Sequence, residues 1–176
     1  PRDTSVAPPG PAGSVVLHLV SRGENTGPQG GSWREFPAEN WIVLSADQAQ
    51  ALLPSDKPTP GTSYEMNAAT ATKILKYFYP QSEDPTDSPW TKVDREALKA
   101  TMLSVDHGTA TARLEGSVQL QRNFYPGKYS PERMTATVLG FVQWQPQTHL
   151  ITSFELVTDE AKKDNERYAV AVRMER

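Results

Sequence analysis

Apolar and polar residues alternate along the stretch from Thr109 to Phe124. One parity carries only small or aliphatic residues, namely Ala110, Ala112, Leu114, Gly116, Val118 and Leu120. The other parity is polar or charged, with Thr109, Thr111, Arg113, Glu115, Ser117, Gln119 and Gln121. Successive side chains of a strand point to opposite faces of a sheet, so a period of two predicts a long strand with one buried face. A shorter strand, Lys99 to Val105, should precede it across the turn Asp106-His107-Gly108.

The segments after this strand predict further strands. Met134 to Trp144 alternates in the same way, and Leu139 and Phe141 make its second face apolar as well. This pattern predicts a central strand that is covered on both sides. His149 to Val157 and Tyr168 to Met174 follow, separated by a charged stretch. Because strands adjacent in sequence tend to pair, we expect four or five consecutive antiparallel strands.

Two short helices are predicted nearer the N-terminus. Ser45, followed three residues later by Gln48, forms a capping box, and Pro54 should end the helix that it starts. Asn67 is a suitable N-cap for a second helix, from Ala68 to about Phe78. The apolar stripe of this second helix consists of Ala71, Ile74, Leu75 and Phe78, at the spacing i, i+3, i+4 and i+7.

Together these elements predict the fold class α+β. Ser14 to Ser21 and Trp41 to Leu44 are β-rich and should extend the sheet or close its second face. The inward faces of the strands carry five small residues, Ala110, Ala112, Gly116, Ala136 and Gly140. These residues leave room for the second helix to lie close. We therefore expect a single domain with a curved antiparallel β-sheet, a meander or half-barrel, packed by two helices.

Composition sets the domain organisation and excludes several function classes. The 176 residues suit one domain, and residues 1–13, with four prolines and two glycines, are expected to be a flexible tether to a single domain spanning 14–176. A net charge of -3 creates no general attraction for nucleic acid. The absence of cysteine excludes disulfides and thiolate chemistry. No apolar run approaches the ~18 residues of a transmembrane helix.

Four strings of the sequence resemble a known group of proteins when they are taken together. They are residues 35–45 (EFPAENWIVLS), 78–80 (FYP) followed by Glu83-Asp84, 113–116 (RLEG) and 124–127 (FYPG). This combination resembles an uncharacterised domain family of exported bacterial proteins, over roughly residues 33–174. The resemblance implies an extracytoplasmic location, periplasmic or secreted. It brings no known activity and no site residues.

Catalytic signatures are sparse. His18, His107 and His149 lack the spacing of metal ligands, and the chain has no nucleophile elbow and no phosphate-binding loop, so we expect no metal, cofactor or catalytic residue. The enzyme alternative rests on carboxylates at 83, 84, 87, 94 and 96 and on Glu115, which could perform acid–base chemistry on a glycoside. The simpler interpretation is a solvated acidic loop, partly neutralised by Lys92 and Arg95.

The segment from residue 122 to residue 133 is the strongest candidate for binding. It combines basic and aromatic side chains, which binding hot spots favour, in Arg122, Phe124, Tyr125, Lys128, Tyr129 and Arg133. The competing interpretation places Phe124 and Tyr125 over the end of the sheet. We therefore expect a non-catalytic interaction module of an exported bacterial protein, which contacts a protein partner or another domain of its parent protein and not nucleic acid. The alternatives are a glycosidase-like hydrolase and a carrier of a small apolar ligand within the curved sheet.

Overall fold

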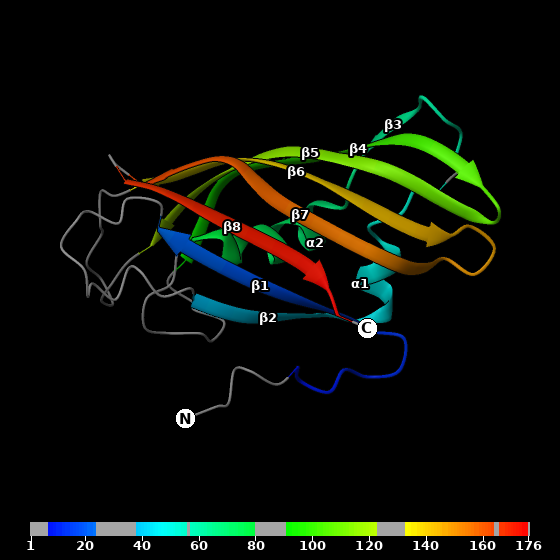
Figure 1. Ribbon diagram of the computed structural model, residues 1–176, viewed down its shortest axis with the longest axis horizontal. Coiled ribbons are helices and arrows are strands. Elements are labelled where there is room, and N and C mark those ends of the chain that lie inside the picture. Colours follow the sequence, from blue (N-terminus) through cyan, green and yellow to red (C-terminus); the bar gives the residue numbers. More distant parts are fainter. Residues whose placement is uncertain are drawn as a thin grey trace.

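One antiparallel sheet of eight strands dominates the computed structural model (Figure 1), which describes residues 7–23, 38–55, 57–79, 91–122, 133–163 and 166–175. Its strands are β1 (Val15–Gly23), β2 (Ala38–Leu44), β3 (Ser63–Glu65), β4 (Thr91–Asp106), β5 (Thr109–Arg122), β6 (Arg133–Gln145), β7 (Leu150–Lys163) and β8 (Glu166–Met174). Their order across the sheet is β2-β1-β8-β7-β6-β5-β4-β3. The sheet is therefore open, with β2 and β3 at its edges.

The five strands from β4 to β8 lie side by side in chain order, which confirms the predicted run of consecutive antiparallel strands. The N-terminal strands extend this sheet. β1 pairs with the last strand, with Leu17 opposite Met174, and on its other side with β2, with Val15 opposite Leu44. The first and last strands of the chain are thus neighbours in the sheet.

The two predicted helices form where their capping residues stand. They are α1 (Ala46–Gln50) and α2 (Ala68–Leu75), and α2 continues into the 3-10 turn η2 (Lys76–Phe78). The Ser45 hydroxyl accepts a hydrogen bond from the Gln48 N–H at 3.3 Å, while the Gln48 side chain accepts one from the Ser45 N–H at 3.1 Å. The Asn67 side chain caps α2 by accepting from the Thr70 N–H at 3.1 Å. Strands hold far more of the chain than these helices do, so the label α+β fits only loosely.

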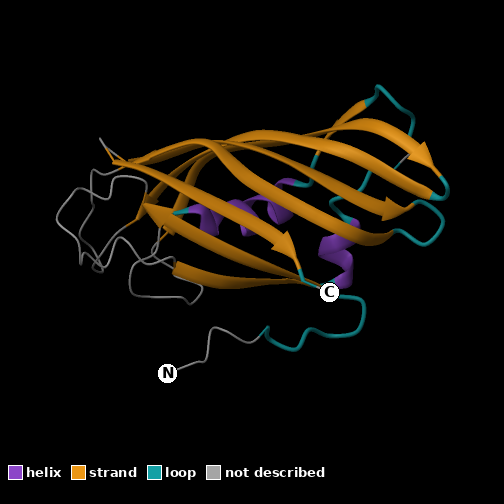
Figure 2. Cartoon of the chain, in the orientation of Figure 1, coloured by secondary structure: helices purple, strands orange, loops and turns teal. Residues whose placement is uncertain are grey.

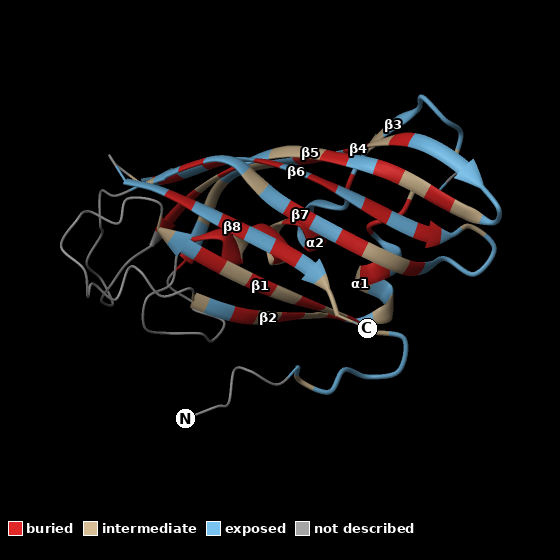
Figure 3. Cartoon of the chain, viewed as in Figure 1, coloured by how far each residue is buried: buried red, intermediate tan, exposed pale blue. Residues whose placement is uncertain are grey.

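The core lies between the sheet and α2. The strands curve around this helix (Figure 2), which is closest to β4. All four residues of the predicted stripe are buried, namely Ala71, Ile74, Leu75 and Phe78. Burial alternates along the strands (Figure 3), most regularly on β6, where every second residue is buried. The apolar parity of the sequence is therefore the face that turns toward the helix.

Two glycines mark places where adjacent strands come unusually close. A Cβ atom at Gly140 would lie 2.0 Å from the carbonyl oxygen of Glu155, and one at Gly116 would lie 2.3 Å from that of Ala97. Both oxygens belong to the neighbouring strand. Glycine at these two positions therefore admits the adjacent strand, a reason that the sequence pattern did not predict.

The structure corrects the prediction that β6 is covered on both sides. Leu139 and Phe141 are 40% and 48% exposed, because both described helices lie on the other face of the sheet. The strands also differ from the prediction in several places. β4 begins at Thr91, ahead of the expected start, and a bulge between Val93 and Arg95 breaks its alternation there. The strand β3 was missed, and β7 continues through charged residues to Lys163.

Candidate interaction surface

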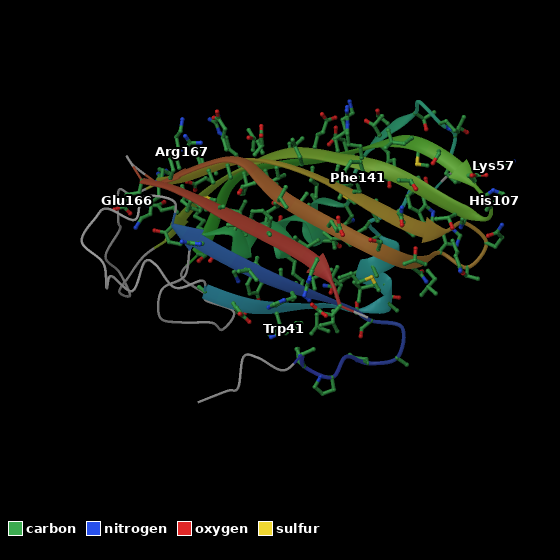
Figure 4. All side chains as sticks on the ribbon, viewed as in Figure 1. Trp41, Lys57, His107, Phe141, Glu166 and Arg167 are labelled. Carbon is green, nitrogen blue, oxygen red and sulfur yellow. The ribbon has the colours of Figure 1, made fainter. Side chains whose placement is uncertain are left out.

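The face of the sheet that points away from α2, called the outer face below, carries an exposed apolar row. Register places Leu139 opposite Val157, Val157 opposite Ala171, and Ala171 opposite Val20, so four neighbouring strands contribute one residue each. Val157 is 45% exposed, close to the exposure of Leu139. Phe141 lies two residues farther along β6 than Leu139, on the same face, and it is labelled in Figure 4. Side chains of this size at the centre of a sheet are normally buried.

Next to the apolar row, the outer face is hollowed. The hollow has a volume of about 340 Å³ and is lined by, among others, Arg95, Ser117, Thr135, Thr137, Glu160 and Lys162. Arg95 forms no ion pair with a carboxylate in the described parts of the chain. The ammonium of Lys162 lies 3.9 Å from the Glu160 carboxylate. We call this region the basic hollow.

A small ion-pair network lies beside the basic hollow. The Asp94 carboxylate lies 3.1 Å from the Arg133 guanidinium and 3.2 Å from the Lys92 ammonium. Register places Gln121 opposite both Lys92 and Arg133, and Gln121 is buried. Since Asp94 meets two cations, this network remains positively charged. Its surface pairs contribute little to stability, so their main effect is on the local field.

A second polar cluster lies at the β1–β2 edge of the sheet. The rings of His18 and Trp41 stack with their centroids 4.3 Å apart. The two ring nitrogens of His18 lie 3.2 Å from the Glu39 carboxylate and 3.5 Å from that of Glu175. Figure 4 labels Trp41 on this edge strand. The cluster joins β1, β2 and the segment after β8, so it can stabilise the seam between them.

The structure describes few of the residues predicted for binding. Phe124, Tyr125, Lys128 and Tyr129 lie outside the described residues. Arg122 ends β5, and only its backbone is described. Arg133 begins β6 and is paired with Asp94. The apolar row and Arg95 were missed as site residues. A signal for the row existed, because Leu139 and Phe141 break the polar parity of β6, although this break predicts burial as readily as an exposed contact surface.

Two of the three described carboxylates of the hydrolase alternative, Glu96 and Glu115, lie on opposite faces of the sheet. Glu83, Asp84 and Asp87 lie outside the described residues. Glu96 faces α2 and accepts a hydrogen bond from the Thr72 hydroxyl, whereas Glu115 lies on the outer face with Arg113 at 2.9 Å. Opposite faces of one sheet cannot present two carboxylates to a single glycosidic bond. In the described ranges, no three histidine or carboxylate side chains are grouped so as to hold a metal ion.

In the apolar-carrier alternative, a small apolar ligand would need space on the inner, concave face of the sheet. Its concave side holds α2 and several fully buried large side chains, including Trp144 and Phe154. Burial raises the pKa of Tyr64 and of Tyr168 on this side, and negative charge on Tyr79 adds to the effect at Tyr168. These phenols therefore stay protonated at neutral pH and are poor general bases.

None of the described helices combines the length and the apolar character that crossing a membrane requires. Comparisons of the chain with protein-family models, with curated proteins and with solved structures found no match.

Proposed function

We propose that this chain is a non-catalytic interaction module of an exported protein, and that its outer face contacts a protein partner or another domain of the parent protein. The observation that carries the proposal is the apolar row, with Leu139 and Val157 side by side and both more than a third exposed. Exposed apolar side chains that adjoin each other on one face are a common sign of a protein contact. Phe141 adds an aromatic side chain, a residue type enriched at interface centres.

The proposed contact lies on the sheet face, and the predicted contact through Arg122, Phe124, Tyr125, Lys128 and Tyr129 stays a prediction. Arg133 still belongs to this surface, because it lies on the outer face beside the basic hollow. The export of the protein rests on the sequence resemblance alone. The hydrolase alternative loses support from the opposite orientations of Glu96 and Glu115.

Site-specific photo-crosslinking tests the proposal. A photo-reactive residue at Phe141 reports on the outer face, and one at the exposed Gln50 of α1 reports on the opposite side of the molecule. Incubated with the envelope and secreted proteins of the producing cell, the Phe141 probe should give a discrete product that the Gln50 probe does not give. An excess of unlabelled protein should compete with the probe and abolish this product. An excess of the double variant Leu139→Ser, Val157→Ser should not.

Two results would contradict this function. Equal yields at both positions, or no product at Phe141, would mean that the outer face is not a contact surface. Turnover of a glycoside or ester that is lost in Glu83→Gln or Asp84→Asn would favour the hydrolase instead.

A further inference from the structure

The outer face is ordered in rows that run across the strands. One row joins Arg95, Gln119, Thr135 and Lys162, which stand opposite one another on β4, β5, β6 and β7. The next row along the strands joins Ser117, Thr137 and Glu160. The row after that is the apolar row, which begins at Leu139. The cations and the apolar row are therefore separated by a single row of mainly hydroxyl-bearing side chains.

The spacing of these rows matches an extended peptide. From Thr135 to Leu139 is four residues along β6, and four residues of strand span about 14 Å. An extended segment that follows the strands covers the same span in four residues. Its side chains at positions i and i+4 point the same way. An acidic residue at one position would reach Arg95 or Lys162 while an apolar residue at the other rests on Leu139 and Val157.

The charge of this region favours an acidic occupant. This region holds the cations Lys92, Arg95, Arg133 and Lys162 and the carboxylates Asp94 and Glu160. Glu115, which stands opposite Leu139, is paired with Arg113, so these eight described residues carry a local charge of +2 in a chain whose net charge is -3. Arg95 presents a guanidinium without an ion-pair partner in the described ranges. An arginine of this kind can form two parallel hydrogen bonds with a carboxylate.

The middle row can hold the backbone of the occupant. The Thr137 hydroxyl oxygen accepts a hydrogen bond from the Glu160 N–H at 3.2 Å, so its own O–H is oriented to donate elsewhere. Ser117 stands opposite Thr137 on the same face and is exposed. Hydroxyl groups in this place suit the carbonyl oxygens of a peptide that crosses from the cations to the apolar row.

We propose that the basic hollow and the apolar row form one docking site for an extended, acidic protein segment that carries an apolar residue four positions from a carboxylate. This inference rests on the proposed function and adds the chemistry of the partner. A nucleic acid or a sulfated polysaccharide would use the cations but leave the apolar row exposed, and the net negative charge of the chain disfavours such polyanions. A protein segment satisfies both parts of the site.

Fluorescence anisotropy with labelled ten-residue peptides tests the proposal. The probe carries two leucines and two glutamates at i and i+4 spacing, joined by serine and threonine. The controls are the same peptide with lysine in place of glutamate, and a scrambled peptide of equal composition. The glutamate peptide should bind, and Arg95→Gln with Lys162→Gln should weaken it by about tenfold or more. Leu139→Ser should weaken it by a similar factor with an unchanged melting temperature.

A charge exchange makes the test specific. Arg95→Glu with Lys162→Glu should abolish binding of the glutamate peptide and create binding of the lysine peptide. The proposal is overturned if no peptide binds, if the scrambled peptide binds equally well, or if Leu139→Ser leaves the affinity of the glutamate peptide unchanged. Photo-crosslinking at Phe141 distinguishes failure of this proposal from failure of the proposed function. A specific crosslinked product at Phe141, together with no binding of either peptide, would mean that the outer face contacts a partner of different chemistry.

Discussion

The ammonium group of Lys73 on α2 donates a hydrogen bond to the carbonyl oxygen of Val43 on β2 at 2.7 Å. The same group lies 2.9 Å from the side-chain oxygen of Gln48, which also caps α1. One cation thus joins the central helix, the first helix and an edge strand.

Replacement of this cation should therefore destabilise the fold. Lys73→Met keeps the length of the side chain and removes both hydrogen bonds, so we expect the free energy of unfolding to fall by about 1–3 kcal/mol. Lys57→Met, at an exposed loop position, should change it by less than about 0.5 kcal/mol. Urea unfolding measures both. Equal effects of the two variants would show that the bonds of Lys73 contribute nothing net.

Leu75 tests the packing of α2 against the sheet. Its side chain is fully buried, so Leu75→Ala should lower the free energy of unfolding by roughly 2–5 kcal/mol. Leu150→Ala is the matched control, because that leucine is about half exposed. Thermal or chemical unfolding gives both values. A loss below about 0.5 kcal/mol for Leu75→Ala would indicate a differently docked helix.

Gly140 tests the close approach of β6 and β7. In Gly140→Ala the new Cβ would meet the Glu155 carbonyl oxygen at 2.0 Å, so the strands must separate, and we expect a loss of about 3 kcal/mol or more. Gly61→Ala has open space around the new methyl group but a φ of +86°, so it should cost only about 1–2 kcal/mol. Amide hydrogen exchange at Leu156 should accelerate in the first variant alone. A Gly140→Ala protein as stable as the unchanged chain would refute the close contact.

Alkaline pH should destabilise the protein through its buried phenols. Burial raises the pKa of Tyr168 above its ordinary value of 10.0 in the folded state. The folded chain therefore holds this proton more tightly than the unfolded chain. Its contribution to stability is complete below about pH 10 and is lost as the pH rises further. Tyr168→Phe should make the decline in stability above about pH 10 less steep, as measured by urea unfolding at a series of pH values.

Stability at pH 7 distinguishes the two buried phenols. The Tyr168 hydroxyl has no hydrogen-bond partner among the described residues, so Tyr168→Phe should change stability there by less than about 1 kcal/mol. Tyr64 donates to the carbonyl oxygen of Leu52 at 3.3 Å, so Tyr64→Phe should lower stability by about 0.5–1.5 kcal/mol. If the free energy of unfolding declined equally steeply above about pH 10 in Tyr168→Phe and in the unchanged protein, this account would be contradicted.

The turn between β4 and β5 offers a stabilising change. His107 and Gly108 have φ values of +47° and +78°, and Asp106 pairs with Thr109 across them. Two positive φ angles are typical of a type I′ turn, in which Asn-Gly is the preferred pair. His107→Asn should therefore raise the midpoint of thermal unfolding slightly, whereas His107→Val should lower it, because branched side chains avoid positive φ. A rise with valine would contradict this reason.

Local signals predicted the elements that depend on local chemistry. Ser45 with Gln48, and Asn67, mark helix starts because their side chains satisfy backbone groups within one turn. The parity of β5 predicted its buried face for a similar reason, since alternation is a property of each strand alone. The early start of β4 was hidden by a bulge at Asp94, which changes the parity and so breaks the pattern.

The candidate site could not be predicted in the same way. An apolar residue on both faces of β6 shows that both faces favour contact, but whether the second contact is internal or with another molecule depends on how many layers the fold has. The rows that join Arg95 to Lys162, and Leu139 to Val157, depend on strand register and on the bulge between Thr137 and Val138. Neither the register nor the bulge can be recognised from the sequence close to these residues.

The pairing of the first strand with the last has a consequence for the order of folding. The hairpins from β4 to β8 can form between neighbours in sequence, with short loops to close. β1 finds its partner only when Leu17 meets Met174, so this pairing closes nearly the whole chain as one loop and carries the largest entropic cost. We expect the seam between β1 and β8 to form last and to open first. During synthesis on the ribosome, β1 can pair with β2 once both have emerged, but the side of β1 that pairs with β8 would stay unpaired until β8 has been made.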